Sequence, residues 1–304
     1  MNVAKTGPLS PKPGALKTWI LAARPKTLWA AVAPVLIGTA MAFGDGLFYW
    51  PAAAIALLGA LLIQIGTNLA NDYYDFRSGA DDEKRLGPLR VTQAGLVSPE
   101  QIKRAFIGTF ALAFFSGLYL VWLGGWPVLV LGILSILFGV LYTGGPYPLG
   151  YNGLGDVFVL IFFGPVAVGG TYYVQANLIT WPVLVAGLGP GFIAVGLLAV
   201  NNLRDIVSDR AAGKRTLAVR FGAPFARLEY LASIVIPCLI LPILIWMTGG
   251  HYPVLLALGI LPVAIPALKL VMSRREGIIL NEVLASTGKI LLLYGVLFSI
   301  GWIV

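Results

Sequence analysis

The sequence predicts an all-α membrane protein with about nine transmembrane helices around a central cavity. Of its 304 residues, 58% are hydrophobic and 11% are charged, and the mean hydropathy is +0.87. A soluble domain has about 45–50% apolar and about 25% charged residues. Several apolar runs also reach the roughly 20 residues that cross about 30 Å of hydrocarbon. These observations together predict a polytopic membrane protein.

The chain divides into a polar segment, residues 1–23, and one transmembrane domain, residues 24–304. The polar segment has no apolar core followed by a small-residue cleavage site, so we expect no secretory signal. Apolar runs bounded by Gly, Pro, Trp or charge predict the helix cores. They are 27–43, 51–72, 100–123, 126–143, 154–174, 181–203, 225–247, 253–272 and 283–303. Ser98-Pro99-Glu100-Gln101 has the pattern of a capping box and marks the third helix start.

The positive charges support nine spans and orient them. With nine spans, all 21 Lys and Arg fall on one side, within 5–26, 77–104, 204–227 and 269–289. The positive-inside rule then places the N-terminus in the cytoplasm and the C-terminus outside. The formal charge of +8 suits a face that meets anionic headgroups or an anionic substrate. No separate basic domain exists, so nucleic acid is not an expected partner.

Two acidic clusters follow the second and sixth predicted helices. The first is Asn71-x3-Asp75 with Asp81 further on, and the second is Asn201-x3-Asp205-x3-Asp209. Positions i, i+4 and i+8 share one helix face. Asn68 and Asp72 lie close to the first stripe, and Asn202 lies close to the second. The matching positions suggest two four-helix repeats and a ninth helix.

Carboxylates gathered at a membrane boundary repel one another unless cations neutralise them. Mg²⁺ prefers oxygen ligands and typically bridges one or two carboxylates to substrate phosphates. We therefore expect the two stripes to bind Mg²⁺ with a diphosphate between them. The predicted metal ligands are Asn68, Asn71, Asp72, Asp75, Asp81, Asn201, Asp205 and Asp209. The bases expected to bind the diphosphate are Lys84, Arg85, Arg90, Arg204, Arg210, Lys214 and Arg215.

Other interpretations of the acids remain open. Each aspartate alone is typical of a helix end or a solvated loop. An ion-coupled secondary transporter would also place acids in membrane helices. A non-catalytic membrane scaffold is a third alternative, but it gives no reason for two clusters.

The two acidic segments resemble the aspartate-rich motifs of the UbiA-type intramembrane prenyltransferases. They read NDYYDFRSGAD from residue 71 and NNLRDIVSDR from residue 201. RPKTL at 24–28, GPLR at 87–90 and YTGGPYPLGYNGLGD at 142–156 extend the resemblance over most of the chain. NDYYDFRSGAD, GPLR and GLGD favour the branch that prenylates 1,4-dihydroxy-2-naphthoate.

This resemblance implies an activity and its reactants. A polyprenyl group passes from an allylic polyprenyl diphosphate to 1,4-dihydroxy-2-naphthoate, releasing diphosphate and CO₂ in menaquinone biosynthesis. The resemblance also implies Mg²⁺ as cofactor and Asp75, Asp205 and Asp209 as catalytic residues. It implies a protein of the bacterial inner membrane. Another aromatic acceptor remains an alternative. The sequence departs from many relatives in two places. Gly79 stands where they carry an acid, and residues 143–155 contain no Lys or Arg where relatives often carry one.

Further residues are candidates on weaker grounds. Asp156, after GLG, could be a catalytic base or an additional Mg²⁺ ligand, although an acid also suits a helix N-terminus. Arg24 and Lys26 could bind the acceptor carboxylate, although they also suit positive-inside anchors. Tyr142 could hydrogen-bond a substrate. Phe162, Phe163, Tyr172 and Tyr173 could exclude water from an allylic cation, or could simply pack between helices.

Overall fold

A computed structural model of the chain describes residues 13–79, 86, 87, 89–274 and 277–304. Every regular element within these residues is a helix. The α-helices are α1 (Ala15–Ala23), α2 (Trp29–Gly44), α3 (Trp50–Arg77), α4 (Pro99–Gly124), α5 (Trp126–Leu141), α6 (Gly155–Ile161), α7 (Ala167–Ala176), α8 (Trp181–Ala211), α9 (Leu217–Thr248), α10 (Leu261–Met272) and α11 (Leu280–Ile303). The 3₁₀-helices are η1 (Pro25–Thr27), η2 (Gly150–Asn152), η4 (Tyr252–Ile260) and η5 (Gly277–Ile279), and η3 (Phe162–Val166) is a π-helix.

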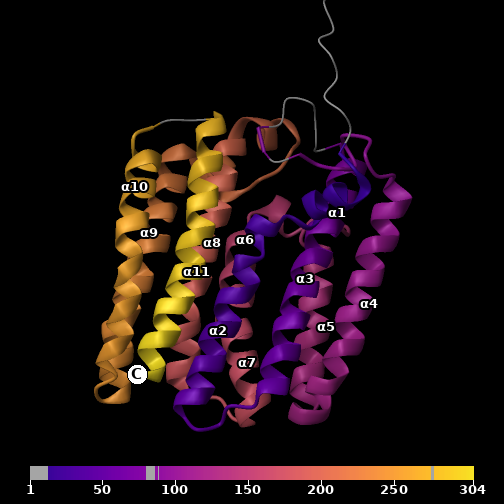
Figure 1. Cartoon of the computed structure of the whole chain (residues 1–304). Helices are drawn as coiled ribbons and strands as arrows, with labels where there is room; N and C mark the ends of the chain where they lie inside the picture. The colour runs from indigo at the N-terminus through magenta and orange to yellow at the C-terminus, as the bar shows by residue number, and fades with distance from the viewer. Residues whose placement is uncertain (1–12, 80–85, 88, 275–276) are drawn as a thin grey trace, which may run out of the picture.

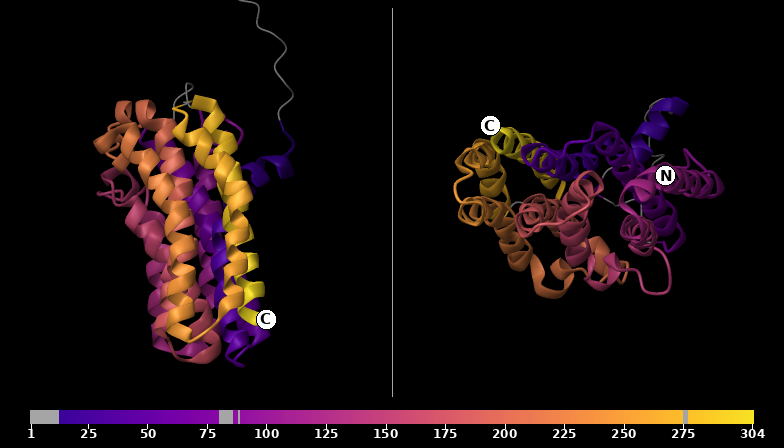
Figure 2. Two further views of the ribbon diagram at one scale, coloured as in Figure 1. Left: turned by 90° about the vertical axis from the view of Figure 1, so that its left-hand side faces the viewer. Right: turned by 90° about the horizontal axis from the view of Figure 1, so that it is seen from below.

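The long helices run roughly parallel and form one bundle (Figure 1). Helices α9, α10 and α11 lie on one side and α3, α4 and α5 on the other, with α2, α6, α7 and α8 between them. Viewed along its length, the bundle surrounds a central region rather than forming layers (Figure 2). We call the end at which α3 and α8 finish the charged end, and the other the opposite end. Helix α1 lies across the charged end.

The number of membrane spans is seven or eight by length and composition, within the described residues. Seven helical stretches are long and apolar enough, and the pair 15–27 and 29–44, bent by 52°, makes an eighth. Helix α5 corresponds to the fourth predicted span but has only 16 residues. The structure therefore confirms a multi-pass helical membrane protein. Nine spans and the orientation of the termini stay predictions.

Helices α3 and α8 continue past their predicted ends. The predicted cores stop at residues 72 and 203, whereas α3 reaches Arg77 and α8 reaches Ala211. Asp75, Asp205 and Asp209 are therefore helical. The predicted start of α4 is confirmed, because Ser98 and Gln101 form a complete capping box.

The fifth predicted span is not one continuous helix. It breaks into α6, η3 and α7, with Gly164 at φ −110°, ψ −113° and Pro165 beside it. Proline removes a backbone donor and interrupts the helical ladder. A Cβ on Gly187 of α8 would lie 2.7 Å from Pro165 Cα, so glycine there lets α8 pack directly on the break.

Most buried apolar side chains form one core between α2, α7, α8, α9, α10 and α11. A smaller cluster joins α1, α3 and α4 at the charged end. Helix α5 contributes no fully buried residue. The bundle is thus closely packed on the side of α9–α11, and its cavities lie towards α3, α4 and α5.

Candidate active site

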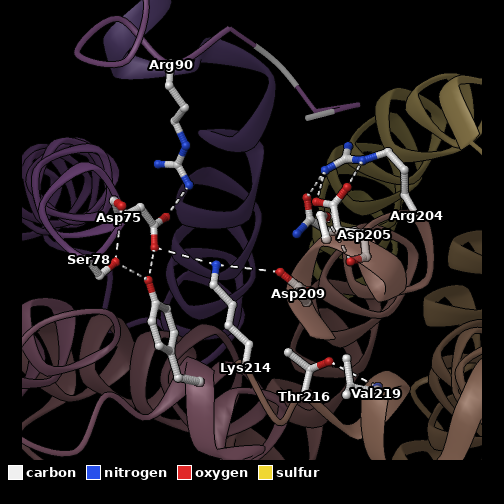
Figure 3. A network of polar contacts seen from close by, with 12 residues as sticks. Asp75, Ser78, Arg90, Arg204, Asp205, Asp209, Lys214, Thr216 and Val219 are labelled. Atoms are coloured by element: carbon white, nitrogen blue, oxygen red, sulfur yellow. Dashed lines mark hydrogen bonds and ion pairs between the residues drawn. The ribbon is translucent and has the colours of Figure 1, made fainter. Parts of the chain in front are cut away.

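The two acidic clusters face each other across one cavity at the charged end. The cavity has a volume of about 250 Å³. Asp75 reaches it from α3, and Asp205 and Asp209 reach it from α8 (Figure 3). The amides of Asn71, Asn201 and Asn202 also line it. Two segments 130 residues apart in sequence therefore place oxygen donors around a single space.

Asp75 is the most heavily contacted carboxylate of the site. It is 2% exposed, and Arg90 Nη2 lies 2.5 Å from its Oδ2. The phenol of Tyr151 donates a hydrogen bond to Oδ1 and also lies 3.1 Å from Ser78 Oγ. Burial, followed by the charge of Asp75, raises the pKa of Tyr151, so the phenol stays protonated as a donor. Tyr151 lies in the segment 142–156 that extends the resemblance, but it was not among the predicted site residues.

The second cluster is organised by Arg204. Its Nε and Nη2 donate to Asp205 Oδ1 and Oδ2 at 2.8 and 2.5 Å. Nη2 also donates to Asn201 Oδ1 at 2.7 Å, and Nη1 donates to Asn281 Oδ1 at 2.6 Å. Arg204 is buried and does not line the cavity. Its geometry is that of a residue that orients Asp205 from behind, rather than of a diphosphate ligand.

Lys214 connects the two clusters. Its Nζ lies 3.6 Å from Asp75 Oδ1 and 3.6 Å from Asp209 Oδ1 (Figure 3). The same ammonium lies 4.5 Å from the centre of the Tyr151 ring. One cation therefore sits between carboxylates of α3 and α8, over an aromatic face that favours positive charge.

Two loops at the charged end are fastened together beside Lys214. The backbone N–H of Arg215 donates to Tyr151 O at 2.6 Å. Arg220 donates from Nη2 to Asn152 O at 2.7 Å and from Nε to Arg215 O at 3.0 Å. Gly153 has φ +75°, and a Cβ there would lie 2.9 Å from Arg215 O. Glycine thus permits both the turn and the close approach.

Two predicted metal ligands of the first cluster point elsewhere. Asn68 donates from Nδ2 to Ala23 O at 3.0 Å and to Thr27 Oγ1 at 3.1 Å. Asp72 Oδ2 accepts from the backbone N–H of Val91 at 3.2 Å. Neither lines the polar cavity. Their geometry indicates that they position α1 and the segment after Arg90, so we correct our expectation for both.

Asp156 also lies off the cavity. It is 7% exposed, and its carboxyl group lies close to that of Glu229 on α9. Two buried carboxyl groups that lie side by side repel each other when both are charged. This partner makes Asp156 part of a buried pair between α6 and α9 rather than a group that faces substrate.

The remaining predicted residues divide between the cavity and the surface. Arg24 and Tyr142 line the polar cavity, and Arg24 has φ +53°, which is uncommon for a residue other than glycine. Lys26, Arg210 and Arg215 are exposed and do not line it. Asp81, Lys84 and Arg85 lie outside the described residues.

The donor set fits Mg²⁺ in one particular mode. Within the described residues, no group of three or more Asp, Glu, His or Cys side chains could hold a metal ion. These residues therefore do not form a metal site in which every ligand comes from the protein. Mg²⁺ usually keeps several waters and is bound through one or two carboxylates plus substrate phosphates. Asp75, Asp205 and Asp209 lining a shared cavity fit that mode.

An apolar cavity of about 380 Å³ continues from the polar one. The two share Ala30, Gln64, Asn71, Tyr142, Val159 and Phe163 as lining residues. Phe162 and Phe163 line the apolar cavity as expected. Tyr172 and Tyr173 do not, because their hydroxyls donate to Asp45 Oδ2 and Gly124 O at the opposite end. Of the two roles expected for these tyrosines, their contacts fit packing between helices.

Comparisons with known proteins agree with this arrangement. The model of the UbiA prenyltransferase family matches residues 31–277. A 1,4-dihydroxy-2-naphthoate octaprenyltransferase of Escherichia coli K12 is 39% identical over 295 residues, covering 94% of each chain. An enzyme of the same name from Haemophilus influenzae is 37% identical, covering 95% of this chain and 96% of its own.

A solved structure shows the same fold. A UbiA homologue from Archaeoglobus fulgidus, bound to DMAPP and Mg²⁺, superposes with a TM-score of 0.63 at 17% identity. The match covers 93% of this chain and 99% of that one.

Proposed function

This chain belongs to the UbiA prenyltransferase family, and from that premise we propose that it prenylates 1,4-dihydroxy-2-naphthoate with an allylic polyprenyl diphosphate. The products are diphosphate, CO₂ and a prenylated dihydroxynaphthalene for menaquinone biosynthesis. One observation carries the proposal. Asp75 and Asp209 line the same polar cavity, with Lys214 between them, and this cavity continues into an apolar one. A substrate with a charged head and a long apolar tail matches that pair of cavities.

The polar cavity holds the diphosphate. Asp75, Asp205 and Asp209, with Asn71 and Asn201, would hold Mg²⁺ between protein and phosphate. The bound metal neutralises charge that develops on the leaving diphosphate. Arg90 and Lys214 lie on the same carboxylates and add positive charge around the phosphates.

The acceptor ring binds where the two cavities join. Tyr142 lines both cavities and supplies a phenol for a ring hydroxyl, and Arg24 lines the polar cavity and supplies a guanidinium for the acceptor carboxylate. The ring attacks the allylic carbon as its C–O bond breaks, and the electron pair of the lost carboxylate stays on the ring. The C–O bond of the donor and the C–C bond between the ring and its carboxylate are broken, one C–C bond to the prenyl group is formed, and diphosphate and CO₂ leave, with no net proton released.

Water has to be kept from the allylic carbon. Phe138, Phe158 and Phe162 form an aromatic cluster beside the apolar cavity, with ring centroids 4.7 to 6.1 Å apart. Aromatic faces exclude water and tolerate positive charge. The donor tail extends from this cluster along the apolar cavity.

The cell location follows from the same chemistry. The charged end carries the phosphate-binding groups, and the positive-inside rule places it in the cytoplasm. We expect the protein in the bacterial inner membrane, in contact with lipid.

The test is a reconstituted assay. Full-length protein, Mg²⁺, 1,4-dihydroxy-2-naphthoate and octaprenyl diphosphate should yield a decarboxylated, prenylated product by mass spectrometry. Chelation of Mg²⁺ should stop the reaction, and Asp75→Asn or Asp209→Asn should reduce it to background. A wild type that forms no product contradicts the proposal. Product formed only with 4-hydroxybenzoate or homogentisate would keep the family and change the acceptor.

A further inference from the structure

Four helices each present a glycine at one level of the apolar cavity. They are Gly59 on α3, Gly117 on α4, Gly132 on α5 and Gly170 on α7, and all four line the cavity. Each lies six to nine residues from the end of its helix at the opposite end of the bundle. At 1.5 Å per residue, this places them about 9 to 14 Å from that end. The cavity therefore has one cross-section bounded by glycine on four sides.

These glycines leave open space rather than close packing. A Cβ on Gly59, Gly117 or Gly132 would meet no atom within 4 Å, and one on Gly170 would meet only Leu131 Cδ1 at 3.9 Å. Gly66 and Gly139, nearer the charged end, behave differently. A Cβ there would lie 2.7 Å from Phe110 and 2.6 Å from Thr67, so those glycines let helices touch. Close helix packing therefore does not explain why residues 59, 117, 132 and 170 are glycine.

The cavity closes just beyond this level. Ala52, Leu120 and Val174 form a buried cluster at the opposite end, and Leu120 and Val174 also line the cavity. On one side, Phe114 and Leu118 of α4 and Ile133 of α5 line the cavity and are 38 to 47% exposed. A chain that passes the four glycines therefore meets an end wall and an apolar edge towards α4 and α5.

We propose that the open cross-section at Gly59, Gly117, Gly132 and Gly170 determines which prenyl donors the protein uses, by admitting the distal part of a long tail. Along α3, Gly59 lies 12 residues, or about 18 Å, from Asn71, which lines the polar cavity beside the aspartates. A short donor ends before this level, whereas a long donor has to pass through it. The inference rests on the proposed function, because it assigns the apolar cavity to the donor tail.

The experiment fills the cross-section and compares two donors. Gly117→Leu and Gly132→Leu each add a side chain to the open space. Gly108→Leu is the matched control, because Gly108 is on α4, is exposed, meets no atom within 4 Å of an added Cβ and does not line the cavity. Each full-length protein is assayed with geranyl diphosphate and with octaprenyl diphosphate. The readouts are kcat/KM and the rise in Tm that each donor causes with Mg²⁺ and no acceptor.

We expect both cavity variants to lower the octaprenyl-to-geranyl ratio of kcat/KM at least tenfold, with an unchanged ratio in Gly108→Leu. The octaprenyl donor should also stabilise the wild type more than the cavity variants. Equal ratios and equal Tm shifts in all folded variants would overturn the inference. If the wild type forms no product, the proposed function fails. The Tm shift caused by each donor then decides by itself whether the four glycines admit a long donor tail. Gly59→Leu replaces either cavity variant that does not fold.

Discussion

The ammonium of Lys214 lies 3.6 Å from Asp75 Oδ1, although the two residues are 139 positions apart in the chain. It lies at the same distance from Asp209 Oδ1. Lys214 follows the second cluster in sequence but reaches the aspartate of the first. The two clusters are therefore joined by a side chain as well as by a shared cavity.

Lys214→Met should weaken the use of the diphosphate donor. A hydrogen bond to a charged group contributes about 1.5–3 kcal/mol, so kcat/KM for the donor should fall roughly 10- to 100-fold. Lys103→Met is the control, because Lys103 is an exposed lysine on α4. Steady-state kinetics with varied donor at saturating acceptor measure the effect. Equal kinetics in the two variants would show that Lys214 has no part in donor use.

Arg220→Ala should act on the same step without touching substrate. Arg220 bonds Asn152 O and Arg215 O, and so fastens the loop of Tyr151 to the loop of Lys214. We expect a higher KM for the donor, a smaller change in kcat and weaker protection by Mg²⁺ with inorganic diphosphate in a thermal shift assay.

Arg220→Lys should not restore the donor KM, because one ammonium does not reproduce the planar fork that reaches both carbonyls. Arg104→Ala, at an exposed arginine on α4, is the control. An Arg220→Ala variant with the wild-type KM and protection would exclude a positioning role.

The helices and their polar faces were predictable from the sequence because both depend on local periodicity. Hydropathy located α2–α5 and α8–α11, and the i, i+4, i+8 spacing placed Asp205 and Asp209 on one face. The start of α4 was predictable from its capping box. The break between α6 and α7 was not, because it depends on Gly164 and Pro165 packing against Gly187 of another helix.

Contacts within the site were harder to predict. Tyr151 reaches Asp75 from a loop 76 residues away, and no local pattern reports such a contact. Of the bases that follow each cluster, Arg90 and Lys214 reach the aspartates, whereas Arg210 and Arg215 are exposed. Loops have no side-chain periodicity, so the sequence identified the group of bases but not which of them turn inward.

Asn68 and Asn71 provide a test of this distinction. They lie three residues apart on α3, but Asn68 bonds Ala23 O and Thr27 whereas Asn71 lines the polar cavity. Asn68→Ala should lower stability, because each lost hydrogen bond contributes about 0.5–1.5 kcal/mol, and should leave the Mg²⁺ requirement unchanged. Asn71→Ala should raise the Mg²⁺ concentration needed for half-maximal rate. Mg²⁺ titrations and thermal unfolding of both variants separate the roles. A shifted Mg²⁺ requirement in Asn68→Ala would restore it as a metal ligand.

The Asp156–Glu229 pair leads to a prediction about structure rather than chemistry. Glu229→Gln keeps the shape of the side chain and gives Asp156 a neutral neighbour that has both a donor and an acceptor. We expect turnover within about threefold of wild type and an unchanged or higher Tm, because a buried carboxyl partner is replaced by a neutral amide. Glu229→Ala should unfold at a lower temperature, because it leaves Asp156 buried without this partner, at a cost of about 1–3 kcal/mol. A catalytic base would behave differently: with Glu229→Gln, turnover would fall steeply while Tm stayed the same. Measuring both quantities on the two variants therefore decides whether the pair holds α6 to α9 or takes part in the reaction.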